Sequence, residues 1–400
     1  MPVSEAEPIV RIASRGDGVT PSGRHVPMTA PGDTILADGA VAPGPHRAEP
    51  PCRHFPECGG CQLQHLDDES YRQFVADRIL SALAAQGIAE PELLPVHLSP
   101  PNSRRRAALS GERRGSRVLL GFRAEASHRV IDMRECFILC PELFVLVEPL
   151  RGLLATLMPK RRSAQVRMSL ADQGVDLLIE NVEAEGLAAA EALTGFAQAH
   201  GLARLSLDEG LGPQTWWEPD PVTVTLSGVP VPLPHNAFLQ ATRDGEAALV
   251  GAVRRAAAGA QTCADLFAGL GTFALALDGR IFAAEGGRDA VLALKAGANQ
   301  AGRPVVVEHR DLFRRPLDGR ELARFEAVVL DPPRAGAKEQ VAQLAASPVP
   351  RIAYASCNPA TFARDARTLI DGGYRIEWIQ PVGQFRWSTH VELAAAFTRS

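Results

Sequence analysis

Short apolar segments alternate with amphipathic ones through the last 140 residues of the 400-residue chain. This alternation predicts an α/β fold with a mostly parallel, doubly wound sheet. In such sheets ligands bind at the carboxyl ends of the strands, so reactive residues are sought there. The predicted strands are TCADLF (262–267), RIFAAE (280–285), PVVVE (304–308), EAVVL (326–330), RIAYASC (351–357), YRIEWI (374–379) and HVELAAAF (390–397), with helices at 289–300 and 359–373.

A glycine-bearing loop follows the first of these strands. The segment DLFAGLGTFALAL (265–277) predicts a strand that ends at Asp265, a tight turn at Gly269 and Gly271, and then a helix. The loop fits G-x-G-x-x-A, which suits a dinucleotide or S-adenosylmethionine equally well. Glu285 ends the next strand, where an acid can accept hydrogen bonds from both ribose hydroxyls. We therefore expect a nucleoside-containing cofactor. The alternative is a glycine turn that serves only helix–sheet packing.

Two further strand ends carry reactive side chains. The segment VVLDPPRAG (328–336) places Asp331 at a strand end that two prolines stiffen. The segment AYASCNPATFARD (353–365) places Cys357 just before Asn358, a good N-cap for the following helix. A thiol beside a helix N-terminus is expected to have its pKa lowered from about 8.5 towards neutrality. Cys357 is therefore a candidate nucleophile, with a small buried apolar cysteine as the alternative.

Three thiols lie close together in CRHFPECGGCQLQHL (52–66), in a chain of seven cysteines. There is no export signal and no apolar run near the ~18 residues of a membrane span, so we expect a cytoplasmic protein without disulfides. The clustered thiols then predict metal or cluster ligands. Cys263, inside a predicted strand, is expected to be a core residue.

The remaining segments predict separate structural units. The chain is too long for one hydrophobic core, so two or three domains are expected. Residues 8–39 alternate β-forming residues with glycine-bearing turns and predict a small antiparallel barrel. Residues 67–88 have the spacing of an amphipathic helix, and 100–240 have a mixed α+β pattern. The net charge of −4 argues against a uniformly basic surface, but 102–117 and 158–163 are locally basic.

Five motifs together carry a family resemblance. DLFAGLGTF, LDPPRAG, SCNPATFARD, THVEL and CRHFPECGGCQLQHL resemble the RNA uracil-5 methyltransferases of the class I, Rossmann-like fold, and the likeness extends over nearly the whole chain. It is strongest to the bacterial 23S ribosomal RNA branch that carries a TRAM domain and a 4Fe-4S cluster. The resemblance implies a TRAM-like, OB-fold RNA-binding domain at 1–46, a central α+β domain with the cluster at 47–235, and an S-adenosylmethionine-dependent methyltransferase domain at 236–400. It leaves open whether the helix at 67–88 packs on the catalytic domain.

The resemblance also implies a covalent mechanism. The thiolate of Cys357 would add to C6 of a uracil, so that C5 can attack the methyl group of S-adenosylmethionine. Glu392 would then remove the C5 proton, after which 5-methyluridine is released. A salt-bridged edge acid is the alternative for Glu392. By position in the family motifs, the cofactor contacts are Gln240, Phe267, Thr272, Glu285, Asp311 and Asp331, although related sequences often have asparagine in place of Thr272 and Asp311.

For the clustered thiols, the resemblance implies a 4Fe-4S cluster held by Cys52, Cys58, Cys61 and a fourth cysteine from a later hairpin. Alignment of VIDMRECFIL with the family pattern makes Cys136 the fourth ligand, with Cys140 as a possible substitute. A zinc ion is the alternative occupant. The cluster is expected to be structural.

The expected partner is RNA, and neither DNA nor a membrane; a monomer is expected. The candidate phosphate contacts are Arg104, Arg105 and Arg106, and a flipped base could stack on Phe238, Trp216 or Trp217, although core packing suits the tryptophans better. A methyltransferase for transfer RNA is the main rival. A non-catalytic RNA-binding protein and a nicotinamide oxidoreductase leave Cys357 unexplained.

Overall fold

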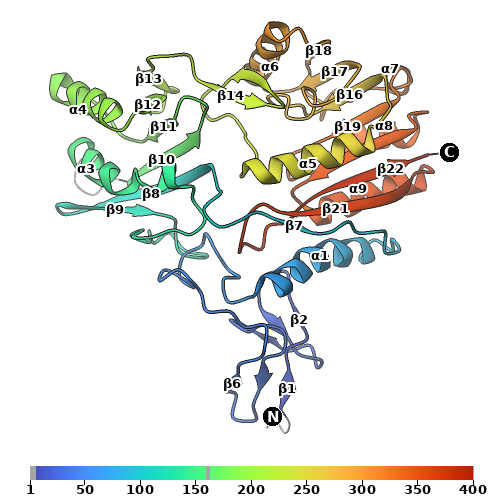
Figure 1. Ribbon diagram of the computed structural model, residues 1–400, viewed down its shortest axis with the longest axis horizontal. Coiled ribbons are helices and arrows are strands. Elements are labelled where there is room, and N and C mark those ends of the chain that lie inside the picture. The colour runs from blue at the N-terminus through green and yellow to red at the C-terminus, as the bar shows by residue number, and fades with distance from the viewer. Residues whose placement is uncertain (1–5, 159–162, 400) are drawn as a thin grey trace.

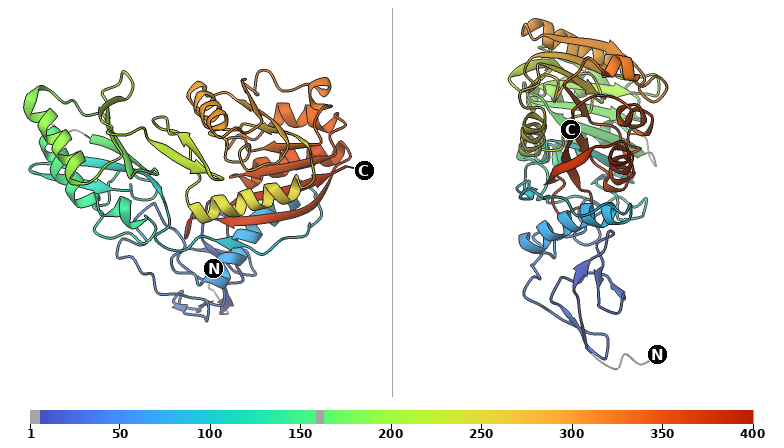
Figure 2. Two further views of the ribbon diagram at one scale, coloured as in Figure 1. Left: turned by 45° about the horizontal axis from the view of Figure 1, so that its top comes forward. Right: turned by 90° about the vertical axis from the view of Figure 1, so that its right-hand side faces the viewer.

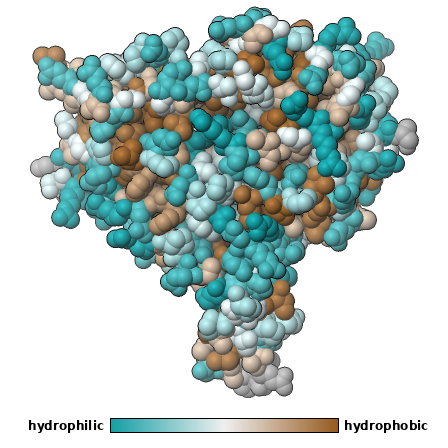
Figure 3. All heavy atoms as spheres, in the orientation of Figure 1, coloured by the Kyte–Doolittle hydropathy of each residue, from teal (hydrophilic) through white to brown (hydrophobic). Residues whose placement is uncertain are grey.

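The computed structural model describes residues 6–158 and 163–399. Figure 1 shows a small N-terminal β unit below two larger bodies, and the left view of Figure 2 shows these two bodies as the arms of a V. In the space-filling view of Figure 3 the N-terminal unit is a narrow projection. Within the described ranges, no helix combines the length and the apolar character that a membrane crossing requires.

The N-terminal unit consists of two small antiparallel sheets, ordered β1-β5-β6 and β2-β3-β4. Its buried Ile12 and Ala30 belong to the same apolar cluster as Leu63 and Leu66, so the unit packs on the segment that follows the clustered thiols. A small antiparallel β unit is present, as the sequence predicts. Its strands are β1 (Glu7–Pro8), β2 (Arg11–Ile12), β3 (Gly18–Val19), β4 (His25–Val26), β5 (Thr34–Ile35) and β6 (Val41–Ala42).

The central body contains a six-stranded sheet ordered β13-β12-β11-β10-β8-β9, in which only β11 and β12 pair in parallel. Helices α3 and α4 form one buried apolar cluster with this sheet. Trp216 and Trp217 pack against the cluster, which agrees with the expectation that they serve core packing. The elements are β8 (Arg106–Arg114), β9 (Arg117–Gly121), α2 (Pro141–Phe144), α3 (Val147–Leu157), β10 (Ser163–Leu170), β11 (Val175–Glu180), α4 (Gly186–Ala199), β12 (Arg204–Asp208) and β13 (Gln214–Trp217).

The other body is an α/β unit around an eight-stranded sheet ordered β18-β17-β16-β19-β20-β22-β21-β7. All neighbouring pairs are parallel except those that β22 makes with β20 and β21. All seven strands predicted from the sequence are present. The elements are β7 (His97–Leu98), α5 (Arg243–Ala256), β16 (Thr262–Leu266), β17 (Arg280–Glu285), α6 (Arg288–Gln300), β18 (Val305–His309), α7 (Gly319–Leu322), β19 (Ala327–Leu330), α8 (Lys338–Ala345), β20 (Arg351–Ser356), α9 (Pro359–Asp371), β21 (Arg375–Gly383) and β22 (Glu392–Thr398).

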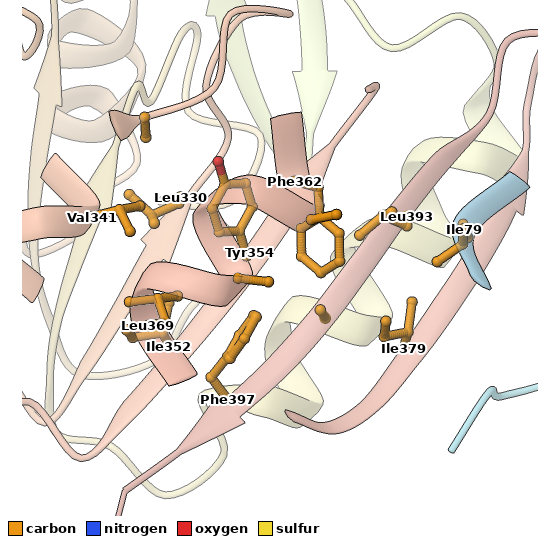
Figure 4. Close-up of a cluster of buried hydrophobic side chains, with 14 of the residues drawn as sticks. Ile79, Leu330, Val341, Ile352, Tyr354, Phe362, Leu369, Ile379, Leu393 and Phe397 are labelled. Carbon is orange, nitrogen blue, oxygen red and sulfur yellow. The ribbon is translucent and has the colours of Figure 1, made fainter. Parts of the chain in front are cut away.

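Side chains along the central strands alternate between two buried clusters, as the two-residue period of a strand requires. On β20, Ile352 and Tyr354 enter the cluster formed with α1, α8 and α9, whereas Ala353 and Ala355 enter the cluster formed with α5 and α6. Figure 4 shows the first cluster, where the rings of Tyr354 and Phe362 meet edge to face with centroids 5.4 Å apart. The sheet is therefore covered by helices on both faces, which leaves its strand ends as the place for a site.

Two elements from before residue 236 pack on this unit. Helix α1 (Asp68–Ala84), whose N-cap Asp67 accepts a hydrogen bond from Ser70 N at 2.8 Å, lies against α9 and β21. The hairpin of β14 (Thr223–Leu226) and β15 (Val229–Pro232) packs on α6. The apolar core around the sheet thus includes residues on the N-terminal side of the proposed boundary at 235.

The segment after the glycine turn is not a helix, contrary to the prediction. Residues 268–276 form successive turns, with hydrogen bonds such as Gly271 N to Ala268 O at 2.8 Å. The Asp265 carboxylate accepts a hydrogen bond from Ala274 N at 2.8 Å, and Phe273 and Leu275 are buried within the α5 and α6 side of the sheet. Anchoring by the strand-end carboxylate and burial of successive side chains take the place of a regular helix.

Candidate active site

The predicted reactive residues meet at one edge of the eight-stranded sheet. Phe267, Asp331 and Cys357 directly follow β16, β19 and β20, and Glu285 is the last residue of β17. Because β22 runs opposite to these strands, its first residue, Glu392, lies at the same edge. The antiparallel placement of one strand therefore adds an acid to a set of residues from parallel strand ends.

All eight predicted catalytic and cofactor residues line one cleft of about 580 Å³. The walls also include Phe238, Arg334 and the glycine turn itself. A cleft of this size suits a ligand of nucleoside dimensions together with a second small group. The eight residues are Gln240, Phe267, Thr272, Glu285, Asp311, Asp331, Cys357 and Glu392.

The glycine turn and the end of β17 form part of the cleft wall. Both carboxylate oxygens of Glu285 accept backbone hydrogen bonds, from Gly269 N at 2.9 Å and from Gly287 N at 2.6 Å. Phe267 has φ of +67°, a left-handed conformation that is strained for an aromatic residue. Gly271 also has positive φ, and a Cβ there would lie 2.3 Å from Leu294 Cδ1. The turn is therefore rigid, and glycine is required where it approaches α6.

Burial drives three groups that line the cleft, Asp331, Cys357 and Glu392, towards their neutral forms. Burial and the Asp331 carboxylate raise the pKa of Glu392 to about 8, while the Gln384 side chain opposes the shift. Burial and the charge of Glu285 raise the pKa of Asp331 to about 7. Each acid suppresses the ionisation of the next, so this part of the cleft holds protons at neutral pH.

The expected lowering of the Cys357 pKa is wrong. Burial raises the pKa of Cys357 to about 11, and the charges of Glu392 and Asp331 add to the effect, whereas Arg334 acts in the opposite direction. Burial and the two carboxylates thus outweigh the helix N-terminus, where Asn358 Oδ1 accepts a hydrogen bond from Ala360 N at 3.1 Å. Cys357 is thus a thiol in the free protein, and its proton must leave when the sulfur reacts.

Arg334 and Gln384 at this site were not assigned from the sequence. Arg334 is the one permanent cation among the described residues that line the cleft, and its backbone oxygen accepts hydrogen bonds from Asn358 Nδ2 at 2.9 Å and Thr361 Oγ1 at 3.1 Å. Gln384 directly follows β21, hydrogen-bonds Gln240, and favours the ionised form of Glu392. Both residues follow a strand's carboxyl end, and that rule could have found them.

The clustered thiols line a second, much smaller cavity of about 20 Å³. Cys52, Cys58, Cys61 and Cys136 all face it, together with apolar side chains such as Phe122 and Ile138. Burial raises the pKa of each thiol, for Cys61 to about 12, and the charge of one thiolate raises the pKa of its neighbours. Four sulfurs from two distant segments are thus brought together.

Cys140 and Cys263 lie apart from this cavity. Cys140 is the N-cap residue of α2 and is buried in the core of the central body. Cys263 is buried in the sheet, as the sequence predicts. The packing therefore favours Cys136 over Cys140 as the partner of Cys52, Cys58 and Cys61.

The consecutive arginines of the basic segment at 102–117 differ in their contacts and in their exposure. Arg106 lies over the Phe238 ring, with the guanidinium carbon 4.9 Å from the ring centroid, beside the cleft. Arg105 is buried; it donates to Gln240 O at 3.0 Å and pairs with the Glu246 carboxylate, so its interpretation as a phosphate contact is wrong. In the second basic segment, 158–163, residues 159–162 lie outside the described residues.

Arg105→Met is expected to lower the free energy of unfolding by about 3–5 kcal/mol, because it leaves the carboxylate of Glu246 buried without its partner. Urea unfolding measures the change, and Arg117→Met, at an exposed arginine of β9, is the matched control. An unchanged unfolding midpoint with weakened RNA binding would show that Arg105 contacts RNA after all.

Comparisons with known proteins agree with this geometry. The family model described as tRNA (uracil-5-)-methyltransferase matches residues 304–400. The chain is 54% identical to an RNA methyltransferase from Zymomonas mobilis, across 98% of this chain and 99% of that one. It is 32% identical to the 23S rRNA (uracil(1939)-C(5))-methyltransferase RlmD of Halomonas elongata, across 94% and 87% of the two chains.

A solved structure shares the whole fold. The tRNA (uracil-54, C5)-methyltransferase of Pyrococcus abyssi, in complex with S-adenosyl-L-homocysteine, superimposes with a TM-score of 0.77 over 99% of this chain and 100% of that one, at 22% identity. Together with the sequence identities, this places the protein: the chain belongs to the family of S-adenosylmethionine-dependent RNA uracil-5 methyltransferases.

Proposed function

We propose that the protein methylates C5 of a specific uridine in 23S ribosomal RNA and so forms 5-methyluridine. The single observation that carries the proposal is that Cys357, Glu392 and the predicted cofactor contacts line one cleft. The relative from Halomonas elongata, whose name specifies 23S rRNA, supports the choice of RNA.

In the proposed mechanism Cys357 and Glu392 act in sequence. The sulfur of Cys357 adds to C6 of the uracil, the S–C6 bond forms, and the electron pair of the C5–C6 double bond moves towards C5 and the adjacent carbonyl. When bound, the cofactor would supply an electrophilic methyl group: the C5–CH₃ bond would form as the sulfonium S–CH₃ bond breaks, which leaves S-adenosylhomocysteine. Glu392 then removes the C5 proton, and the electron pair left behind re-forms the C5–C6 bond and expels the sulfur.

The raised pKa values set the proton movements of this scheme. Cys357 must lose its proton as it adds, and the charges of Asp331 and Glu392 act directly on the thiol. Both acids are partly ionised near neutral pH, with pKa values of about 7 for Asp331 and about 8 for Glu392, and Glu392 is needed at C5. We therefore propose that Asp331 accepts the thiol proton, which leaves Glu392 to act at C5.

The test is nucleoside mass spectrometry of separated 23S ribosomal RNA and transfer RNA from cells with and without the gene. Loss of one 5-methyluridine from 23S ribosomal RNA is expected, with restoration by the wild-type gene and none by a Cys357→Ala gene. Loss from transfer RNA instead would establish the rival substrate. Unchanged 5-methyluridine in both RNAs would contradict the proposed function.

We further propose that Cys52, Cys58, Cys61 and Cys136 hold a 4Fe-4S cluster. A tetrahedral zinc ion with Zn–S bonds of about 2.3 Å would bring its four sulfurs within about 3.8 Å of one another. Among the potential metal-ligating atoms of His, Cys, Asp and Glu in the described part of the chain, the only group of three or more that lie within 4.8 Å of one another belongs to His46, Asp67 and Glu69. No three of the four thiols lie that close to one another, and the cavity that they line is small. The choice of a 4Fe-4S cluster over zinc follows the family resemblance, and its role would be to tie residues 52–61 to Cys136.

Purification without oxygen is accordingly expected to yield a brown protein that contains iron and acid-labile sulfide. Cys136→Ser should lose most of the iron because it removes one of four thiolate ligands. Cys140→Ser, a buried cysteine that does not line the cavity, should retain the iron. Stoichiometric zinc without iron, or loss of iron from Cys140→Ser alone, would contradict the assignment.

The two remaining domain assignments are part of the same proposal. The small antiparallel sheets within 1–46 would act as a TRAM-like RNA-binding domain, and the central body would present RNA to the cleft. A groove lined by His235 and Asn236, near the end of the central body, and by Asp289 and Leu292 of α6 runs into the cleft, with which it shares His235 and Asp289. RNA that lies along this groove would reach the cleft directly.

A further inference from the structure

Gln384 does not line the cleft itself but lies next to two side chains that do, Gln240 and Glu392. It is 2% exposed and directly follows β21. Its Oε1 accepts a hydrogen bond from Ala241 N at 2.9 Å, and its Nε2 donates to Gln240 Oε1 at 2.7 Å. Its side chain also lies beside the carboxyl group of Glu392 and favours the ionised form of that acid. Every polar atom of this amide is therefore used.

The orientation of the Gln384 amide follows from its partners. A backbone N–H can only donate, so the atom that faces Ala241 N must be the oxygen. The NH₂ group then donates to Gln240 Oε1, and it is the part of Gln384 that can favour an ionised Glu392 carboxylate. Because Gln240 uses its oxygen here, its own NH₂ group is left for a ligand in the cleft that Gln240 lines.

The surrounding packing fixes Gln384 in this place. A Cβ at Gly245, in the first turn of α5, would lie 2.7 Å from Gln384 Cβ and 3.1 Å from its Oε1. Gly245 N is held in turn by Thr242 Oγ1 at 3.1 Å, the N-cap bond of α5. The close approach of α5 leaves the glutamine no second position.

We propose that Gln384 is a positioning residue, which holds the carboxylate of Glu392 towards C5 of the uracil and the amide of Gln240 towards the cofactor. This inference rests on the proposed function. One buried side chain would then act on both parts of the site, because it lies beside the catalytic base Glu392 and hydrogen-bonds the cofactor contact Gln240.

Removal of the Gln384 donor has a definite electrostatic consequence. The groups whose charges act on Glu392 are Asp331 after β19 and Arg106 on β8, and Cys357 after β20 senses the charge of Glu392 in turn. Gln384 favours the ionised form of Glu392, as does Arg106, whereas Asp331 opposes it. Without the donor, the pKa of Glu392 must rise above its value of about 8, and a higher pH is needed to form the base.

The decisive variant is Gln384→Glu. It keeps an oxygen for Ala241 N but replaces the donor with a second carboxylate beside Glu392 and Gln240. Loss of a donor beside a charged group predicts a roughly 10- to 100-fold slower release of the covalent RNA adduct near neutral pH. The slower release should recover as the pH is raised, and binding of S-adenosylhomocysteine should weaken because Gln240 loses its partner.

Gln380→Glu is the matched control, because Gln380 lies on β21 and donates to Pro95 O at 2.6 Å, away from the cleft. It should leave the pH profile unchanged. Gln384→Met, which removes the donor without adding a charge, gives a second measurement: a smaller alkaline shift in the same direction. Rates for all variants are compared after circular dichroism has established that each is folded.

The outcomes distinguish failure of the proposed function from failure of the inference about Gln384. If the wild-type protein forms no 5-methyluridine in any RNA, the proposed function fails. If the wild-type protein is active and both Gln384 variants lose rate equally at every pH, or lose none, Gln384 does not position the base and the inference is overturned.

Discussion

Cys357→Ala is expected to lower methyl transfer to RNA by at least about 10⁴-fold, because removal of a catalytic nucleophile leaves only binding and electrostatic contributions. Uracil C5 is a weak nucleophile until a sulfur has added at C6. S-adenosylmethionine binding should persist, because the substitution leaves the glycine turn and Glu285 unchanged. Transfer of a labelled methyl group measures the first effect, and calorimetric titration measures the second.

Cys263→Ala is the matched control, since Cys263 is a buried cysteine within β16 that does not line the cleft. It should retain activity. Because the pKa of Cys357 is about 11, formation of the RNA adduct by the wild-type protein should accelerate as the pH rises through the neutral range. Substantial methyl transfer by Cys357→Ala would refute the covalent mechanism.

Glu392→Gln is expected to trap the RNA on the protein. The amide cannot remove the C5 proton, so addition and methyl transfer proceed while release slows by about 10²- to 10⁴-fold. The adduct should appear as a band of reduced mobility on a denaturing gel, and protease digestion should locate the RNA on the peptide that contains Cys357. In the wild-type protein, release should accelerate as Glu392 ionises around pH 8.

Two variants make this result specific. Combining Glu392→Gln with Cys357→Ala should abolish the adduct, because no sulfur is left to form it. Glu377→Gln, on the neighbouring strand β21 and outside the cleft, should release product normally. Rapid turnover by Glu392→Gln would require a different base.

The sequence was sufficient to locate the site because its residues follow a local rule. Each strand of a parallel sheet delivers the residue at its carboxyl end to the same edge, so Glu285, Asp331 and Cys357 could be grouped without knowledge of their contacts. Glu392 and Gln240 lie outside this rule, since one begins an antiparallel strand and the other precedes α5. They could be grouped with the site only through the family resemblance.

What the sequence could not provide depends on contacts between distant segments. The pKa of Cys357 is governed by burial and by two acids from other strands, and these outweigh the helix that follows it in sequence. Arg105 was interpreted as a phosphate contact because it stands in a basic run, yet its partner Glu246 lies on α5. Gln384 follows a strand's carboxyl end, but its contacts with Gln240 and Ala241 depend on how the fold brings distant segments together.

Strand β22 is the last strand of the described sheet in chain order, yet it lies between β20 and β21. During synthesis, these two strands therefore emerge before the partner that separates them, and each has an unpaired edge until residue 398 has left the ribosome. The same strand delivers Glu392. A nascent chain can thus neither close its sheet nor turn over substrate until this strand has inserted.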